Sequence, residues 1–252
     1  MRDRPPPQGI LLAQSAGTSP ALAQALHALQ IPCHPIVVTD IKPLEPINQN
    51  QSLGLKPDLL IFLSQNSVRH GHSVLARFRE VPTIGVGPAT SELLSSFNRR
   101  PLTIPSLYSS EGLIDVLKNY ASSTQLGLVC GKHGRDLLQI QAQRLGMTVQ
   151  RFEVYDRVRA VVPADELSLI RQSITTGLLK VVTATSVHIL NDAISLINDS
   201  HHSLQSLHVV CFSERIDAAA RSLGFTNTTA VQQSDINHLV PAIRDAWQSL
   251  AN

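Results

Sequence analysis

Residues 59–68 read LLIFLSQNSV, and residues 181–187 read VVTATSV. Each stretch is an apolar run that ends in small polar side chains and then enters a helical pattern. Apolar runs without alternation are typical of strands buried on both faces, as in parallel sheets. We expect such strands at residues 10–13, 58–63, 83–86, 126–130, 179–183 and 207–212, with helices between them. The sequence therefore predicts an α/β protein.

Residues at the helix ends support this interpretation. Ser19 is expected to cap a helix with Pro20 in its first turn, and Ser234 is expected to cap the last helix. Gly146 and Gly224 follow leucine-containing helical patterns and suit the left-handed position after a helix.

Three strand-to-helix turns occur twice along the chain. Residues 63–68, 87–90 and 109–113 form the first set, and residues 182–187, 213–216 and 233–236 form the second. A strand-helix unit that ends in Leu-Gly also occurs twice, at residues 10–33 (with Gln30 in place of glycine) and at residues 127–149. A repeat of this kind predicts two similar domains.

The order of these units allows two partitions. Either the domains are consecutive, or the middle of the chain, about residues 40–155, is inserted in a domain made from both ends. Two extended stretches, Pro35–Ile41 and Phe152–Ala160, lie at the crossings that an insertion needs. They would be linkers that run side by side.

Composition excludes several classes of protein. Of the 252 residues, 43% are hydrophobic, which is enough for a core and excludes wholesale disorder. The formal net charge is only +2, so we expect no nucleic-acid partner. There is no secretion signal and no apolar run of 18 residues, so we expect a cytoplasmic protein without a membrane span.

All six repeated turns lie where a strand's C-terminus meets a helix N-terminus. Free backbone N–H groups and the positive end of the helix dipole gather there, which favours binding of anions. The side chains at these turns are Ser64, Gln65, Asn66, Ser67, Thr90, Thr183, Thr185, Ser186 and Ser213. Helix capping is the alternative role for such residues. Six turns on two domains predict one cleft lined with hydrogen-bond donors.

Motifs for other chemistries are incomplete. Gly127–Lys132 lacks the spacing of a phosphate-binding loop, and the sequence Gly85-x-Gly87 lacks the third glycine of a dinucleotide site. The histidine pairs at residues 70 and 72 and at residues 201 and 202 are expected to be surface pairs without acidic or cysteine partners. We therefore expect neither a metal nor an organic cofactor.

Tyr155 is the unusual polar residue, because it lies in the motif VYDR (154–157) at the second predicted crossing. An un-ionised phenol can donate a proton at neutral pH. The alternative is a tyrosine whose ring is packed and whose hydroxyl is hydrated.

The order of these motifs resembles the uroporphyrinogen-III synthase family over nearly the whole chain. The likeness rests on LLIFLSQNSV, IGVGPAT, SSEGL, LVCGKHGRDLL, LGMTVQRFEVYDR, VVTATSV and SERIDAAARSLGF in that order. It implies two flavodoxin-like α/β domains, one inserted in the other and joined by a two-strand linker. The discontinuous domain would hold residues 1–37 and 158–252, and the inserted domain would hold residues 40–155.

The resemblance also implies a reaction. The substrate would be hydroxymethylbilane, a linear tetrapyrrole with eight carboxylates. The enzyme would remove its terminal hydroxyl as water, invert ring D through a spirocyclic intermediate and close the ring to uroporphyrinogen III. It would use no metal or cofactor. Its substrate would be handed over by hydroxymethylbilane synthase. Since no large exposed apolar patch can be read from the sequence, we expect a monomer.

Roles follow by matching residues to the family. Tyr155 matches a tyrosine that assists loss of the hydroxyl, and Ser64 and Thr90 match polar residues of the family's turns. We add Gly87, Ala89, Ser110, Gly131, Lys132, Arg135 and Arg215 as substrate-binding candidates at the same turns. Ile216, Ser213 and Gln14 depart from the family's residues, so the share of the terminal regions in the site is an open question.

Two other functions fit the same residues. The protein could be a two-domain binder of a small polyanion that catalyses nothing, or a family member that has lost activity and acts as a scaffold. Comparing the type III and type I porphyrin isomers formed from hydroxymethylbilane, with and without the protein, separates these functions from the synthase.

Overall fold

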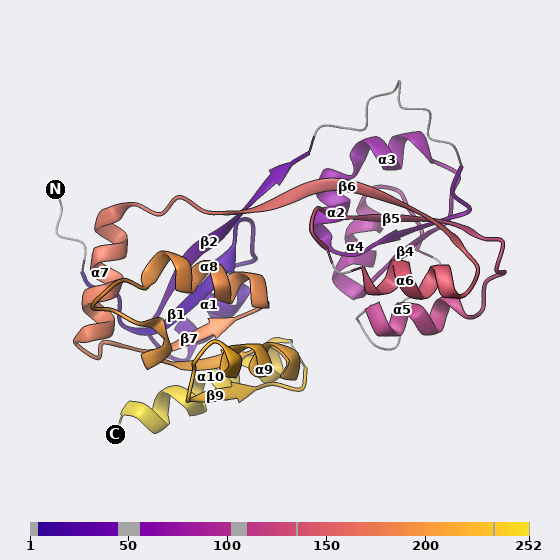
Figure 1. Ribbon diagram of the computed structural model, residues 1–252. Helices are drawn as coiled ribbons and strands as arrows, with labels where there is room; N and C mark the ends of the chain where they lie inside the picture. Colours follow the sequence, from indigo (N-terminus) through magenta and orange to yellow (C-terminus); the bar gives the residue numbers. More distant parts are fainter. Residues whose placement is uncertain (1–4, 45–55, 102–109, 135, 234, 252) are drawn as a thin grey trace. The chain divides into compact units, whose positions relative to one another are not determined.

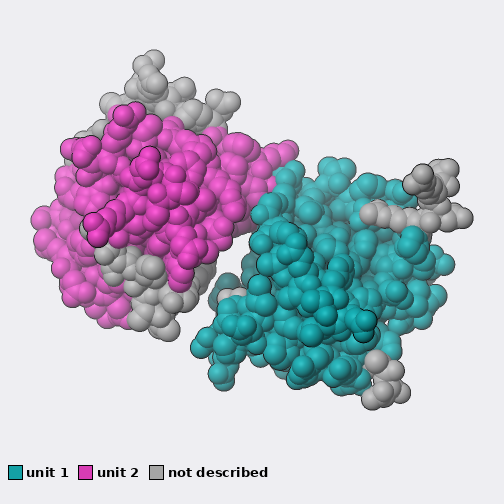
Figure 2. Space-filling view, turned by 180° about the vertical axis from the view of Figure 1, so that it is seen from behind, with its two compact units in different colours: residues 1–40, 158–252 teal, residues 41–157 magenta. Residues whose placement is uncertain are grey.

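The computed structural model describes residues 5–44, 56–101, 110–134, 136–233 and 235–251 (Figure 1). The chain divides into two compact units (Figure 2). Unit 1 contains residues 1–40 and 158–252, and unit 2 contains residues 41–157. The sequence predicts the crossings at residues 37–40 and 155–158, and the units meet at residues 40/41 and 157/158. That each unit is a domain able to fold alone stays a prediction.

Unit 1 is a parallel sheet with helices around it. Its elements are β1 (Gly9–Ser15), α1 (Ala21–Ala28), β2 (Cys33–Pro43, which continues into unit 2), α7 (Ala164–Thr175), β7 (Leu179–Ala184), α8 (Val187–Ile197), the 3₁₀ turn η1 (Leu204–Ser206), β8 (His208–Cys211), α9 (Glu214–Ser222), β9 (Thr228–Ala230) and α10 (Ile236–Ala251). The strand order is β2-β1-β7-β8-β9, and the paired neighbours are parallel. Numbered within the unit, this is the flavodoxin-like order 2-1-3-4-5.

Unit 2 is also a parallel α/β sheet. Its elements are β3 (Leu59–Phe62), α2 (Gln65–His70), α3 (His72–Arg77), β4 (Thr83–Gly85), α4 (Pro88–Ser96), α5 (Ser110–Leu117), β5 (Gln125–Gly131), α6 (Leu137–Arg144) and β6 (Thr148–Arg159, which continues into unit 1). The strand order is β4-β3-β5-β6, with parallel pairs. Pro101 adds an isolated parallel bridge to Thr83 on β4.

The two sheets have the same topology in permuted chain order. The strands β5, β6, β3 and β4 stand where β1, β2, β7 and β8 stand in unit 1. Pro101, beside β4, takes the place that β9 takes beside β8. These equivalences agree with the predicted repeat for the first pair of turns, which follow β3 and β7, and for the Leu-Gly units, which begin with β5 and β1. The third pair of turns, at residues 109–113 and 233–236, lies partly outside the described residues.

The equivalence extends to single residues. The pairing of β1 with β2 has a register shift between Gln14 and Ser15. The pairing of β5 with β6 has a register shift between Cys130 and Gly131. Past each shift, Ser15 pairs with Thr39, and Gly131 pairs with Tyr155. The next backbone N–H donates at 2.8 Å to the carbonyl of Thr39 in unit 1 and of Tyr155 in unit 2. Thr39 and Tyr155 therefore occupy matching positions.

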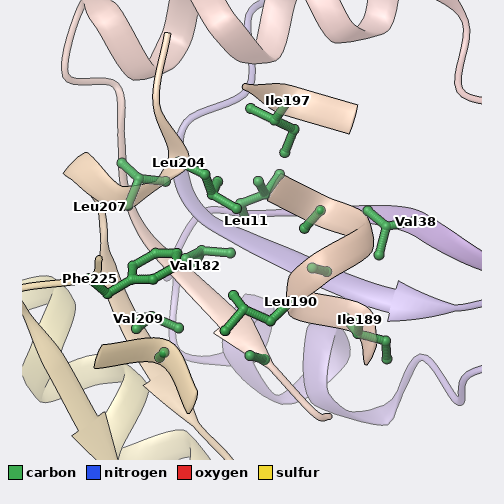
Figure 3. Close-up of a cluster of buried hydrophobic side chains, with 14 of the residues drawn as sticks. Leu11, Val38, Val182, Ile189, Leu190, Ile197, Leu204, Leu207, Val209 and Phe225 are labelled. Atoms are coloured by element: carbon green, nitrogen blue, oxygen red, sulfur yellow. The ribbon is translucent and has the colours of Figure 1, made fainter. Parts of the chain in front are cut away.

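Each sheet is buried on both faces. In β1, Leu11 and Ala13 pack into one cluster, and Ile10 and Leu12 pack into another on the opposite face. Figure 3 shows the first cluster, where Leu11 lies among side chains of α8, β7 and β8. Successive strand residues point to opposite faces, so an uninterrupted apolar run fills both layers. This confirms the prediction of parallel, doubly covered strands.

The two extended stretches lie in the strands that pass between the units. Residues 35–41 fall in β2, and residues 152–160 end β6 and continue one residue past it. Within unit 1, Ala160 N–H donates to the carbonyl of Val38 at 2.9 Å. Within unit 2, Leu44 N–H donates to the carbonyl of Val154 at 3.1 Å.

The two predicted glycine positions after helices are confirmed. Gly146 and Gly224 have φ of 87° and 95°, and Gln30 takes the left-handed position with φ of 57°. The prediction for Ser19 was wrong, because Pro20 is the N-cap of α1 and Ser19 only accepts the Ala21 N–H at 3.3 Å. Ser234 lies outside the described residues. The short strand β9 was not predicted, since Thr228–Ala230 has no apolar run.

None of the helices in the described ranges combines the length and the apolar character that a membrane crossing requires.

Candidate functional site

Helix α2 begins at the C-terminal end of β3 with a reciprocal cap. Ser64 is its N-cap, and the Ser64 hydroxyl accepts the Ser67 N–H at 3.0 Å. The Ser67 hydroxyl lies 3.1 Å from the Ser64 backbone nitrogen, whose N–H donates to it. These bonds satisfy two of the N–H groups that a helix start leaves free. The Ser64 hydroxyl therefore has a fixed position at the end of the strand.

Tyr155 of β6 brings a phenol to this cap. Its hydroxyl lies 3.1 Å from Ser64 Oγ and accepts a hydrogen bond from Arg157 Nη2 at 2.8 Å. The Arg157 guanidinium also lies 5.2 Å from the centre of the Tyr155 ring. The ring is 2% exposed, whereas Ser64 and Arg157 are partly exposed. The phenol is thus held by two residues that open toward solvent.

Gly131 permits this placement of the tyrosine. A Cβ at residue 131 would lie 2.7 Å from both Cε2 and Cζ of Tyr155 and 3.0 Å from its hydroxyl oxygen. Side chains do not approach so closely, so the ring rests directly on the glycine backbone. Gly131 therefore acts through Tyr155.

His70, the last residue of α2, lies near the phenol ring. The two ring centres are 6.0 Å apart. Burial, with smaller contributions from His72 and Arg69, lowers the pKa of His70 below its ordinary value. The lowered pKa favours the neutral imidazole, and the guanidinium of Arg157 is the charged group bonded to the phenol oxygen.

The other predicted residues of unit 2 are spread over several turns. Gly87 is the N-cap of α4, with exposed Ala89 and buried Thr90 in its first turn. Gln65 and Asn66 accept hydrogen bonds from Arg69 at 2.9 and 3.1 Å. Lys132 is exposed just after β5, and Ser110 is the first residue of α5. Arg135 lies outside the described residues, and so does the side chain of Ser110.

In unit 1 the predicted serines cap helices. Ser186 accepts the Ile189 N–H at 3.2 Å at the start of α8, and Ser213 accepts the Ile216 N–H at 3.4 Å at the start of α9. Thr183 is 2% exposed inside β7. Thr185 is half-buried, and Arg215 is exposed in the first turn of α9. By position in the fold, Ser186 is the counterpart of Ser64.

One of the noted departures, Ile216, has a structural explanation. Ile216 is 2% exposed and packs in the core cluster beside β8, so its apolar side chain fills space under α9. Gln14 is half-buried at the register shift of β1.

Sequence reasoning assigned no role to several residues that the structure brings to these edges. Arg157 was quoted in VYDR, and its separation of two residues from Tyr155 on one strand was the available signal. In unit 1, the Thr39 hydroxyl donates to Asp192 Oδ2 at 2.5 Å, and His188 Nε2 lies 3.2 Å from the same oxygen. The four-residue spacing of His188 and Asp192 was the signal there.

Among the described residues, no three His, Cys, Asp or Glu side chains gather as a metal site would require. The arrangement offers a phenol, two hydroxyls and a guanidinium at the end of one sheet. Such a set can donate protons and hydrogen bonds to an oxygen-rich ligand.

The fold and these turns define a class of protein: an α/β protein with two related parallel sheets whose strand ends carry polar turns. A protein-family model described as uroporphyrinogen-III synthase HemD matches residues 20–241. The chain belongs to the uroporphyrinogen-III synthase family.

Solved structures show the same fold. A uroporphyrinogen-III synthetase from Helicobacter pylori aligns with a TM-score of 0.62 at 11% identity, over 97% of this chain and 98% of that one. A mutant uroporphyrinogen III synthase from Thermus thermophilus aligns with a TM-score of 0.61 at 12% identity, over 96% and 99%. A comparison with curated protein sequences gave no match.

Proposed function

We propose that the protein is a uroporphyrinogen-III synthase that converts hydroxymethylbilane to uroporphyrinogen III, with loss of water and inversion of ring D. Family membership supports the reaction, because the matching model covers residues 20–241. The observation that carries the site assignment is the Tyr155 hydroxyl, held by Ser64 and Arg157 at the strand ends of unit 2.

Tyr155 assists the departure of the hydroxyl. The phenol donates its proton to the leaving oxygen, the carbon–oxygen bond breaks, and water leaves. The phenolate that remains would lie 2.8 Å from Arg157 Nη2 and 3.1 Å from Ser64 Oγ, and both can donate to it. Donors placed where charge develops lower the barrier, and removing one such donor typically costs about 10²–10³ in rate. Because the ring is buried, the proton leaves on the side where Ser64 and Arg157 are exposed to solvent.

The substrate's carboxylates bind at the strand-to-helix turns. Backbone N–H groups at the starts of α2, α4, α8 and α9 supply hydrogen bonds that do not require a high net charge. Ser64, Gly87, Thr90, Ser186 and Ser213 lie at these four helix starts, and exposed Lys132 and Arg215 lie near two of them. This explains how a chain with a formal net charge of +2 can hold a ligand with eight carboxylates.

The cell biology follows from the same assignment. The enzyme acts in the cytoplasm as a monomer and receives its unstable substrate from hydroxymethylbilane synthase. The bilane closes unaided to the type I isomer, so a short transfer time protects it. Sedimentation of the protein alone and mixed with that synthase tests the oligomeric state and the transfer complex.

One assay decides the function. Hydroxymethylbilane is generated in situ, the protein is added, the products are oxidised, and the porphyrin isomers are separated. We expect the type III isomer to predominate with the protein and the type I isomer without it. If the isomer ratio equals that of the protein-free control, the protein is a binder or a scaffold and the proposal fails.

A further inference from the structure

Unit 1 contains a cluster of three polar side chains, His188, Asp192 and Thr39, that the proposed mechanism does not use. Thr39 is fully buried where β2 passes the end of β1, and its hydroxyl donates to Asp192 Oδ2 at 2.5 Å. His188 lies in the first turn of α8, and its Nε2 is 3.2 Å from the same carboxylate oxygen. The cluster thus joins the end of β2 to the start of α8.

Burial within the cluster is graded toward the surface. The side chain of Thr39 is inaccessible, that of Asp192 is 10% exposed, and that of His188 is 46% exposed. Asp192 Oδ2 therefore accepts a hydrogen bond from the buried hydroxyl of Thr39 and also contacts the imidazole of His188. A carboxylate held in this way fixes which ring nitrogen of a histidine points inward.

The outward nitrogen of His188 is the atom left to meet a ligand. The ring contacts Asp192 through Nε2, and its side chain is 46% exposed. Beside it, Ser186 has its hydroxyl engaged by the Ile189 N–H as the cap of α8. The outward nitrogen donates a hydrogen bond when both ring nitrogens carry hydrogen.

We propose that His188 is a substrate-binding residue that donates a hydrogen bond from Nδ1 to one carboxylate of the tetrapyrrole, with Asp192 and Thr39 as its positioning residues. The inference rests on the proposed function and deepens it, since it assigns a charged contact to the turn of unit 1. In the complex, Nε2–H donates to the buried carboxylate of Asp192 and Nδ1–H donates to the substrate's carboxylate.

The position of the cluster supports this assignment. Thr39 stands where Tyr155 stands in unit 2, and Asp192 is six residues after the N-cap of α8, as His70 is six residues after the N-cap of α2. In both units, then, a strand residue contacts the side chain six residues past the cap of the facing helix. In unit 2 the ring of His70 lies near the phenol ring of Tyr155. In unit 1 Thr39 donates to the carboxylate of Asp192, which orients the imidazole of His188.

The alternative is a purely structural pair spaced four residues apart on one helix. Such a pair on a helix surface contributes little to stability, and its loss leaves ligand binding unchanged. The two roles therefore differ in what H188Q changes.

The test compares H188Q with H202Q in the isomer assay. His202 is the matched control, because it also faces an aspartate, Asp199, at 2.8 Å, but lies in the loop that precedes β8. A lost hydrogen bond to a charged group corresponds to a factor of about ten or more in affinity. We expect H188Q to raise KM for hydroxymethylbilane about tenfold with kcat within about twofold, and H202Q to leave both unchanged.

Two further measurements separate binding from folding. The affinity for uroporphyrin III, an octacarboxylate, measured by fluorescence quenching, should fall with H188Q by the same factor as 1/KM. D192N should raise KM as well, and the double variant should be no worse than H188Q alone, because Asp192 acts through the imidazole.

The outcomes are distinct. If wild-type protein yields type III isomer and H188Q keeps the wild-type KM and porphyrin affinity, His188 is structural and this inference is overturned. Equal losses in H188Q and H202Q would overturn it as well. If wild-type protein yields no type III isomer, the proposed function itself fails, whatever H188Q does to porphyrin binding.

Discussion

Thr39 in unit 1 and Tyr155 in unit 2 occupy the same place in two related sheets, yet they differ in chemistry. Each follows a register shift and accepts a 2.8 Å backbone hydrogen bond from the end of the neighbouring strand. Tyr155 has a phenol bound by Ser64 and Arg157. Thr39 has a hydroxyl that donates to the buried carboxylate of Asp192.

The difference shows that the backbone framework and the chemistry vary independently. The repeat preserves strand order, register shift and helix caps, because these depend on backbone hydrogen bonds and apolar packing. At the matching strand position, unit 2 has Tyr155, whose phenol can donate a proton. Unit 1 has Thr39, whose hydroxyl binds the carboxylate of Asp192 on α8. Only unit 2 has the phenol that the proposed dehydration uses, and the four predictions below test that asymmetry.

The largest effect is expected at the phenol. Y155F keeps the ring but removes the donor, so kcat should fall by about 10²–10³ while folding is retained. T39V removes the equivalent hydroxyl in unit 1 and should change kcat by less than about threefold. Isomer-resolved kinetics measure both variants, and Y120F is the control for a tyrosine of unit 2 outside the cluster. A loss below tenfold in Y155F would make this residue a packing residue.

The next effect is expected at the glycine beneath the phenol. In G131A the new methyl would lie 2.7 Å from the Tyr155 ring, so the ring must shift. Because the phenol oxygen moves with the ring, kcat should fall at least about tenfold. Overpacking should also lower the free energy of unfolding by about 1–3 kcal/mol. S15A, at the matching position of unit 1, should leave both unchanged. Wild-type activity in G131A would show that the ring position is not critical.

A smaller effect, on the stability of the protein, is expected in unit 1. T39V removes the hydroxyl that donates to Asp192 Oδ2 from the core side. A buried carboxylate that loses a donor should lower the free energy of unfolding by about 1–3 kcal/mol. Urea denaturation measures this loss, and T39S, which keeps the hydroxyl, should restore most of it. Equal stability of T39V and wild type would mean that water replaces the hydroxyl.

The smallest effect concerns pH and His70 in unit 2. Its pKa is lowered in the folded protein, chiefly by burial. Below about pH 6.5 the unfolded chain therefore binds a proton that the folded chain does not, and stability falls as the pH decreases. Urea midpoints at pH 7.5 and pH 5.5 should show a smaller loss in H70N than in wild type. Equal losses would mean that His70 does not contribute to the pH dependence.

The sequence was most informative where one physical rule acts locally. Uninterrupted apolar runs identified six strands, because parallel strands are buried on both faces. Gly146 and Gly224 were found since left-handed residues favour glycine, and Gln30 was found only through the repeat. Ser19 was misassigned because a cap depends on where the helix backbone actually begins. The short strand β9 was not predicted, because it is defined by its pairing with β8 and has no apolar run.

The candidate site was less accessible from the sequence. Ser64 and Tyr155 were both proposed, but their contact joins residues 91 apart in the chain, and no local pattern contains it. Arg157 stood in the quoted motif without a role, because only the strand geometry turns it onto the phenol oxygen. Thr39 and Asp192 were not considered, since a threonine in a strand and an aspartate in a helix are individually ordinary.

Taken alone, the sequence determined that the chain forms parallel sheets with polar turns at their strand ends, and that this pattern occurs twice. Hydrophobic burial and backbone hydrogen bonding act through short stretches of sequence, so those stretches carry the information. Only the tertiary structure decided that Tyr155 and Thr39 are counterparts, and which side chains surround each. Register and packing bring together residues that are distant in the chain, and the chemistry of each edge depends on those neighbours.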